Sequence, residues 1–240
     1  MTPVWEEPFR LRTNDFDPRL QWKPSAVLDL FQSAAGVHAD SLCAGYRDML
    51  SQGLLWVLVR VKYEVIATPP LYSRVIVRTW PLAPGGMSCR RDYLVTDEAG
   101  GELLRGTSDW VFLDAATRKL APPHNVYPPD ATYLTERALS GRVARVPDFE
   151  GEGPLLTVIP GFSEEDMNGH VNNTRYADFA LNALSPAENE RIAAFQIDFR
   201  REVLPGEPLT LSCRREDGRA LVRGEGGEGE CRFACAVTWA

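Results

Sequence analysis

Long apolar runs, histidine and lysine are all scarce in this chain of 240 residues. No apolar run approaches the roughly 20 residues that span a bilayer. The N-terminus has neither the basic region nor the apolar region of a signal peptide. We therefore expect a cytoplasmic protein with no membrane partner. A composition that is 44% hydrophobic suffices for one large globular unit or for two modest domains with separate cores.

Residues that bind metals and cofactors are few and scattered. The chain has 3 histidines, and its 5 cysteines form no Cys-x-x-Cys pair. It also lacks the His-Glu-x-x-His metal motif and the glycine-rich phosphate loops of nucleotide-binding proteins. We expect no metal and no cofactor, and we expect the thiols to be ordinary core or surface groups.

The charge balance is acidic, with a net charge of −7. This argues against nucleic acid as a partner. Arginine supplies nearly all of the 26 cationic residues, and several arginines occur in pairs, among them Arg200-Arg201 and Arg214-Arg215. Such pairs are either solvated strand faces or a local basic patch for an anionic partner.

One order of elements occurs twice along the chain. In the first half, a predicted helix at residues 24–40 precedes alternating, strand-like runs at 56–65, 75–80, 89–96 and 103–113. In the second half, a helix predicted between Asn172-Asn173 and Ser185-Pro186 precedes similar runs at 195–203, 209–215, 219–223 and 231–239. A proline-containing stretch between the halves is typical of a linker that lies over the surface.

This repeat predicts an α+β protein of two tandem domains, each an antiparallel β-sheet wrapped around a central helix. We place the N-terminal domain at residues 1–120, the linker at 121–154 and the C-terminal domain at 155–240. A homodimer is compatible with the sequence, which does not determine the oligomeric state.

The most informative segment is Asp166-Met167-Asn168-Gly169-His170-Val171-Asn172-Asn173-Thr174-Arg175-Tyr176. His170 lies just before the predicted helix, whose first amides, near Val171–Asn173, are able to stabilise an oxygen that becomes anionic during attack. A neutral imidazole is able to take a proton from water. Asp166 could hold the other imidazole nitrogen, and Asn168 could orient water or a carbonyl group. Asn173 is more simply a helix cap, and Tyr176 a core residue.

Glu202 is a second carboxylate, expected on the strand at 195–203. It either helps to activate water or is an ordinary exposed side chain like Glu64. The sequence does not decide whether Asp166 or Glu202 acts on the water.

The segment 166–176 resembles the acyl-acyl-carrier-protein thioesterase family, in which D-x-N-x-H-V-N-N-x-x-Y opens the central helix of the second hot-dog domain. Residues 30–35, 56–58, 78–80, 91–93, 110–114 and 199–203 are also similar to recurring segments of that family. The resemblance implies two tandem hot-dog domains and hydrolysis of fatty acyl thioesters to free fatty acid. It implies catalytic roles for Asp166, Asn168, His170 and Glu202, and an acylated acyl carrier protein as partner. Carrier proteins are acidic, which makes the two arginine pairs candidates for a docking patch.

The first half lacks the motif, because Asp17–Gln21 aligns with Asp166–His170 and has no imidazole. We expect it to be catalytically silent. The resemblance implies that this half holds the acyl chain, with substrate-binding residues Phe31, Ala34, Ala35 and His38 on its helix and Asn172 and Asn173 in the second half. His38 is alternatively a satisfied core histidine.

One residue departs from the family pattern. Plastid members carry a cysteine directly after the glutamate, whereas this chain has Val203. Attack by water is therefore the simpler mechanism. The main alternative is an acyl-CoA thioesterase, since single-domain hot-dog enzymes carry related motifs. A hot-dog dehydratase or hydratase and a non-enzymatic acyl-binding module are weaker alternatives.

Overall fold

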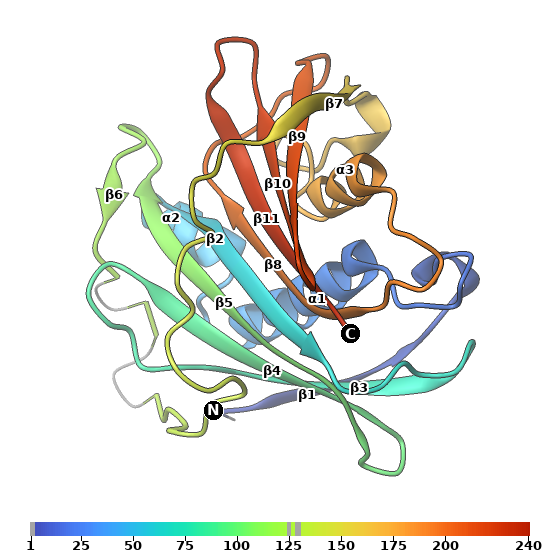
Figure 1. Cartoon of the computed structure of the whole chain (residues 1–240). Coiled ribbons are helices and arrows are strands. Elements are labelled where there is room, and N and C mark those ends of the chain that lie inside the picture. Colours follow the sequence, from blue (N-terminus) through green and yellow to red (C-terminus); the bar gives the residue numbers. More distant parts are fainter. Residues whose placement is uncertain (1–2, 124–125, 128–130) are drawn as a thin grey trace. The chain divides into compact units, whose positions relative to one another are not determined.

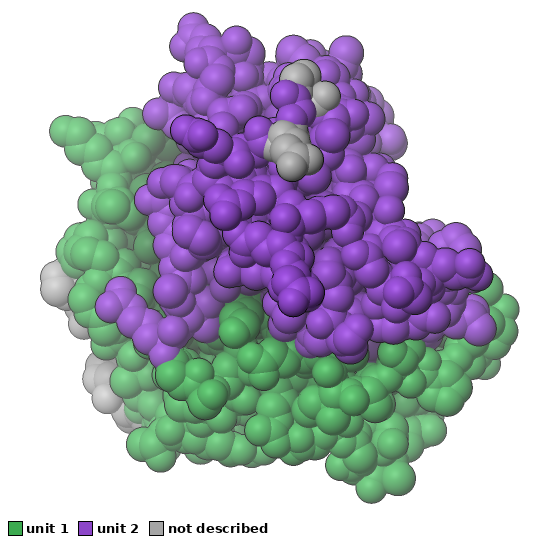
Figure 2. Space-filling view, viewed as in Figure 1, with its two compact units in different colours: residues 1–13, 29–141 green, residues 14–28, 142–240 purple. Residues whose placement is uncertain are grey.

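The computed structural model describes residues 3–123, 126–127 and 131–240. It divides into two compact units (Figure 2): unit 1 contains residues 1–13 and 29–141, and unit 2 contains residues 14–28 and 142–240. The division between residues 141 and 142 falls inside the predicted linker, of which residues 124–125 and 128–130 lie outside the described residues, whereas residues 14–28 of the predicted N-terminal domain belong to unit 2. The domain boundaries at 120 and 154 remain predictions.

Unit 1 is an antiparallel sheet with one long helix against it (Figure 1). Its strand order is β1-β3-β4-β5-β2, with β6 beside β5. The strands are β1 (Trp5–Arg10), β2 (Leu54–Val65), β3 (Arg74–Pro81), β4 (Cys89–Asp97), β5 (Glu102–Asp114) and β6 (Leu120–Ala121). Helix α1 (Pro24–Ser41) packs on this sheet through Phe31, whose ring stacks on Tyr93 at 4.0 Å. A Cβ at Gly106 would lie 2.4 Å from that ring, so glycine allows the close approach.

Unit 2 repeats the arrangement, with strand order β8-β11-β10-β9-β7. The strands are β7 (Glu152–Val158), β8 (Ile192–Phe199), β9 (Leu209–Glu216), β10 (Arg219–Glu225) and β11 (Cys231–Trp239). Helix α3 (Arg175–Leu184) packs against them, with the Tyr176 ring edge-on to Phe233 at 5.3 Å. Ser185 ends this helix in a left-handed conformation with φ of 42°, where the sequence predicted its end.

The predicted strands agree with the observed ones except for β8. Strand β8 begins at Ile192 and stops at Phe199, whereas the alternation predicted a strand at residues 195–203. Three strands and one α-helix were missed: β1, β6, β7 and the short helix α2 (Tyr46–Ser51). The proline at position 8 is unusual in a strand, so the sequence pattern did not predict β1. The structure tolerates Pro8 because β1 is an edge strand of unit 1. In the described part of the chain, no helix is long and apolar enough to cross a membrane.

The linker is more than a connection, because it covers the sheet face opposite to the helix. We call residues 131–149 the strap. In unit 1, Leu134 and Ala138 pack on Trp80 and Leu82. In unit 2, Val146 and Phe149 pack on buried side chains of β10 and β11, namely Leu221, Ala234 and Ala236. Part of the second face of each sheet is thereby removed from water.

A buried aspartate holds the strap in each unit. Asp92 Oδ2 accepts the Ala138 N–H at 2.8 Å and the Arg137 Nε–H at 2.9 Å. Asp198 Oδ2 accepts the Val146 N–H at 2.8 Å. The two aspartates are 0% and 2% exposed, so these bonds form away from water.

We therefore expect Asp198→Ala to destabilise the protein, because the Val146 N–H loses its acceptor in a buried place. The free energy of unfolding should fall by about 1–3 kcal/mol in urea titrations. Asp148, an exposed strap carboxylate paired with Arg200, is the matched control, and Asp148→Ala should change stability far less. Equal effects would show that the buried aspartate has no special role in holding the strap.

Candidate functional site

A tight turn at Asp166–His170 carries the candidate catalytic residues. The Asp166 N–H donates to the His170 carbonyl at 2.9 Å, and the Gly169 N–H donates to the Asp166 carbonyl at 3.0 Å. The Asp166 carboxylate accepts the Asn168 N–H at 2.8 Å. Gly169 has φ of 79°, which favours glycine. Asp166 therefore shapes the turn that presents Asn168 and His170.

The same turn occurs at Asp17–Gln21, as the sequence alignment predicted. The Asp17 N–H donates to the Gln21 carbonyl at 2.8 Å, the Leu20 N–H donates to the Asp17 carbonyl at 3.0 Å, and the Asp17 carboxylate accepts the Arg19 N–H at 2.8 Å. Gln21, which replaces the histidine, bonds through its amide to the Glu190 carbonyl and the Ile192 N–H. In this copy of the turn, the residue in the place of His170 makes hydrogen bonds to the chain itself, as expected if the first half is catalytically silent.

The centre of the site is a pair of side chains from separate segments of unit 2. His170 Nε2 lies 3.1 Å from Glu202 Oε2. The exposed fraction is 24% for the His170 side chain and 54% for the Glu202 side chain, so water and substrate reach both. Sequence spacing alone does not bring residues 170 and 202 together, and the structure does.

Asp166 does not take the role of orienting the imidazole. Among the described residues, no hydrogen bond joins the Asp166 carboxylate to the His170 imidazole, and the second carboxylate oxygen of Asp166 instead accepts from Asn172 Nδ2 at 3.5 Å. The carboxylate that faces the imidazole is that of Glu202.

The amides expected to stabilise an anionic oxygen are mostly occupied. Helix α3 begins at Arg175, later than predicted. The Val171 N–H donates to the Val203 carbonyl at 2.9 Å, and the Asn172 N–H donates to the Glu164 carbonyl at 2.8 Å. Of the three predicted amides, that of Asn173 has no partner within the described part of the chain. The expectation is therefore wrong for Val171 and Asn172.

Asn172 supports the start of α3, a role that we had predicted for Asn173. Its side-chain oxygen accepts the Thr174 N–H at 2.9 Å and the Thr174 hydroxyl at 2.8 Å. Tyr176 is buried, as predicted, but its hydroxyl oxygen also accepts the Val203 N–H at 3.1 Å. No local pattern along the chain indicates this contact, because it joins a helix to a loop 27 positions away.

Glu202 lies in the loop after β8, and the early end of that strand explains its position. A strand continuing to residue 203 would have fixed Glu202 by alternation. The strand ends at Phe199 instead, and Glu202 stands in an irregular loop just before the fully buried Val203. The alternation of side chains along a strand therefore did not predict the position of Glu202.

The predicted acyl-binding residues of α1 are core residues of unit 1. Phe31, Ala34, Ala35 and His38 are all at most 6% exposed. The His38 ring stacks on Trp5, and its Nδ1 lies 2.9 Å from Arg91 NH1. In this conformation the Phe31 ring fills the space against Tyr93, so an acyl chain would enter only if side chains such as Phe31 move.

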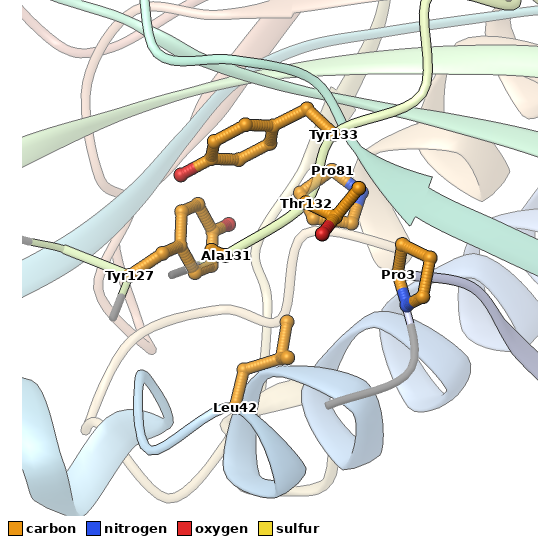
Figure 3. Close-up of a pocket in the computed structure, with 7 residues that line it drawn as sticks. All are labelled: Pro3, Leu42, Pro81, Tyr127, Ala131, Thr132 and Tyr133. Atoms are coloured by element: carbon orange, nitrogen blue, oxygen red, sulfur yellow. The ribbon is translucent and has the colours of Figure 1, made fainter. Parts of the chain in front are cut away.

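A small pocket in unit 1 involves none of the predicted site residues (Figure 3). It is lined by Pro3, Leu42, Pro81, Tyr127, Ala131, Thr132 and Tyr133, and its volume is about 10 Å³. Such a volume holds about one water molecule and is far too small for a fatty acyl chain.

The candidate docking arginines are compensated by acids of the same chain. Arg200 pairs with Asp148 at 2.8 Å, Arg201 with Glu230 at 3.1 Å, Arg214 with Glu216 at 3.2 Å and Arg215 with Glu190 at 2.6 Å. Arg215 also donates to the Leu184 carbonyl at the end of α3. Each of the four arginines thus faces an acid of its own chain, and a docking role for them stays a prediction.

Burial favours the protonated form of three of the thiols. It raises the pKa of Cys89 to about 12 and also raises the pKa of Cys231 and Cys235. Within the described residues, no group of three or more His, Cys, Asp and Glu side chains is placed to hold a metal ion.

Comparisons with known proteins agree with this arrangement. Residues 3–127 match the Acyl-ACP thioesterase N-terminal domain, and residues 156–235 match the Acyl-ACP thioesterase C-terminal domain. The chain is 31% identical over 166 residues to a chloroplastic palmitoyl-acyl carrier protein thioesterase of Gossypium hirsutum, covering 65% of this chain and 40% of that protein. It is 28% identical over 247 residues to a chloroplastic dodecanoyl-[acyl-carrier-protein] hydrolase of Cinnamomum camphora, covering 97% of this chain and 62% of that protein.

Two solved structures share the fold. An acyl-ACP thioesterase from Bacteroides thetaiotaomicron superposes with a TM-score of 0.91 at 22% identity, over 100% of both chains. The 12:0-ACP thioesterase from Umbellularia californica superposes with a TM-score of 0.84 at 23% identity, over 100% of this chain and 98% of that one. The predicted α+β hot-dog architecture is confirmed. The N-terminal and C-terminal domain models of this family together match most of the chain, and the second match includes His170 and Glu202. The chain therefore belongs to the acyl-ACP thioesterase family.

Proposed function

We propose that this protein hydrolyses the thioester of a fatty acyl-acyl carrier protein, releasing free fatty acid and carrier protein. The observation that carries the proposal is the 3.1 Å contact between His170 Nε2 and Glu202 Oε2 in a member of this family. The curated relatives are named for palmitoyl, dodecanoyl and oleoyl carrier-protein substrates, which supports a fatty acyl group.

The pair supplies the acid–base chemistry of the reaction. With its Nε2–H donated to Glu202, His170 has Nδ1 as the acceptor for a proton from water. The water oxygen bonds to the carbonyl carbon, and the proton moves to Nδ1 while Glu202 stabilises the imidazolium. Collapse of the tetrahedral intermediate breaks the C–S bond. The sulfur leaves with a proton from the imidazolium, which restores neutral His170.

Two asparagines complete the proposed site. The exposed Asn168 side chain is held on the turn beside His170 and would orient the carbonyl group. The Asn173 N–H is the amide still available for the anionic oxygen. Asp166 and Asn172 contribute by fixing the turn and the start of α3.

A water mechanism suits the chemistry of the cysteines. Thiolate is the nucleophilic form of cysteine, and burial disfavours it at Cys89, Cys231 and Cys235. The residue after Glu202 is Val203, which has no nucleophile.

Replacing either member of the pair should slow turnover while the fold stays intact. We expect His170→Ala to lower kcat by at least about a hundredfold, since the general base is lost. Glu202→Gln should also lower kcat, because it removes the charge that orients and stabilises the imidazole. Stopped assays on a purified acyl-carrier-protein substrate, with thermal unfolding in parallel, measure both effects.

Glu64→Gln is the matched control. Glu64 aligns with Glu202 in the repeat, its side chain is 50% exposed, and its ion pair is with Lys62. This variant should retain the parent kcat. A folded His170→Ala protein with the parent kcat would contradict the assignment.

The choice of carrier protein over coenzyme A is tested by the two most exposed of the four candidate arginines. The side chains of Arg201 and Arg214 are 60% and 52% exposed, so each could exchange its internal acid for an acid of a carrier protein. We expect Arg201→Glu to lower kcat/KM for acyl-carrier protein roughly fivefold, equivalent to about 1 kcal/mol, and to affect acyl-CoA less. Arg214→Glu should act in the same direction.

Arg74→Glu serves as the control, because Arg74 is 64% exposed and pairs with Glu98 in unit 1. The preference for carrier protein should shrink as added salt shortens the screening length from ~10 Å at 0.1 M to ~3 Å at 1 M. Equal turnover of both thioesters at every salt concentration would favour an acyl-CoA thioesterase.

We also propose that the acyl chain lies against the α1 face of unit 1, where Phe31 now contacts Tyr93. Phe31→Ala would open room there, so we expect the variant to prefer longer acyl chains. The ratio of kcat/KM should rise by up to roughly fourfold per added methylene, because burial of one methylene contributes about 0.8 kcal/mol. Ala35→Phe should shift the preference to shorter chains. Phe112→Ala is the control, because it removes a buried side chain from the separate cluster around Leu42 and Met49. It should leave the chain-length profile unchanged. An unchanged profile in both helix variants would exclude α1 from the acyl site.

A further inference from the structure

The backbone of Val203 is held from two sides. Its carbonyl accepts the Val171 N–H at 2.9 Å, and its N–H donates to the Tyr176 hydroxyl oxygen at 3.1 Å. Val171 directly follows His170, and Val203 directly follows Glu202. His170 is therefore one residue away from the first of these hydrogen bonds, and Glu202 is one residue away from both.

Tyr176 is a rigid support for this contact. It lies in the first turn of α3 and is 2% exposed. Its ring contacts Phe199 edge-on at 5.6 Å and Phe233 edge-on at 5.3 Å. Burial is the largest influence on the hydroxyl and raises the pKa of Tyr176, so the group stays neutral and does not act as a base.

Few other contacts fix the position of Glu202. It follows the last residue of β8 by three positions, in a loop, and its side chain is 54% exposed. Among the described residues, His170 is the cationic partner within ion-pair distance of its carboxylate. The backbone at Val203 therefore decides where the carboxylate stands relative to the imidazole.

The silent half shows that the turn itself does not need this hydroxyl. The Asp17–Gln21 turn forms the same backbone hydrogen bonds as Asp166–His170. Ten positions after its aspartate stands Val27, where the second half has Tyr176. The hydroxyl thus occurs in the half that also carries His170 and Glu202, which favours a role in the site over a role in folding the turn.

We propose that Tyr176 is a positioning residue for hydrolysis: its hydroxyl fixes the Val203 peptide and thereby sets Glu202 against His170. The inference rests on the proposed function, because it assigns Tyr176 a purpose through that catalytic pair. Tyr176 itself contacts neither water nor substrate in this mechanism.

A double-mutant cycle tests the proposal, using Tyr176→Phe, Glu202→Gln and the double variant on an acyl-carrier-protein substrate. We expect Tyr176→Phe to lower kcat about tenfold, since small displacements of catalytic groups are costly, and to leave KM within about twofold. The double variant should be no slower than Glu202→Gln alone, because Tyr176 acts through Glu202.

Thr107→Val controls for the loss of a buried hydroxyl. Thr107 is 5% exposed and its hydroxyl donates to Asp92 Oδ1 at 2.6 Å in unit 1. It should lower the melting temperature much as Tyr176→Phe does and keep the parent kcat. A second variant removes the bond from its other end: replacing the Val203 amide by a backbone ester deletes the N–H and leaves Tyr176 in place. The ester chain should show the same fall in kcat.

The outcomes separate the inference from the function on which it rests. If Glu202→Gln is slow while Tyr176→Phe and the ester chain keep the parent kcat, the positioning role is overturned and the proposed function stands. Independent, multiplicative losses in the double variant would also overturn it. If Glu202→Gln itself retains the parent kcat, the catalytic pair is wrong.

Discussion

The hydrogen bond between Val171 and Val203 is the contact on which the site depends. It ties the segment that carries His170 to the loop that carries Glu202, and all four residues lie in unit 2. A backbone bond is well suited to this task, since it is short, directional and insensitive to side-chain motion. The flexible Glu202 side chain then has a defined starting point, from which its carboxylate reaches the imidazole at 3.1 Å.

The repeat places the same turn in both halves of the chain. Both halves keep an aspartate that closes the turn before a helix, at Asp17 and Asp166. In the first copy, the side chains of Gln21 and Arg19 donate hydrogen bonds to backbone carbonyls of Glu190 and Ala187. The turn is a structural requirement of the architecture, and the chemistry depends on which side chains it presents.

The strap is the other constraint on the architecture. A sheet with one helix against it leaves a second apolar face, which the strap covers in both units. Asp92 and Asp198 each satisfy a strap N–H at a buried place, so the irregular segment incurs no cost for an unpaired amide there. This explains why a segment without regular structure follows a defined path across each sheet.

Local pattern determined much of this protein. Helical spacing located α1, alternation located most of the strands, and the segment 166–176 identified the turn with His170. Alternation failed where β8 ended early at Phe199, because the Arg200 and Arg201 N–H groups both donate to the Arg232 carbonyl and the regular pairing with β11 stops there. The partner of His170, the hydroxyl contact of Tyr176 and the pairing of the arginines with internal acids were decided by the tertiary structure. Each of these contacts joins residues far apart in the chain, and spacing along a sequence carries no information about distances that folding alone creates.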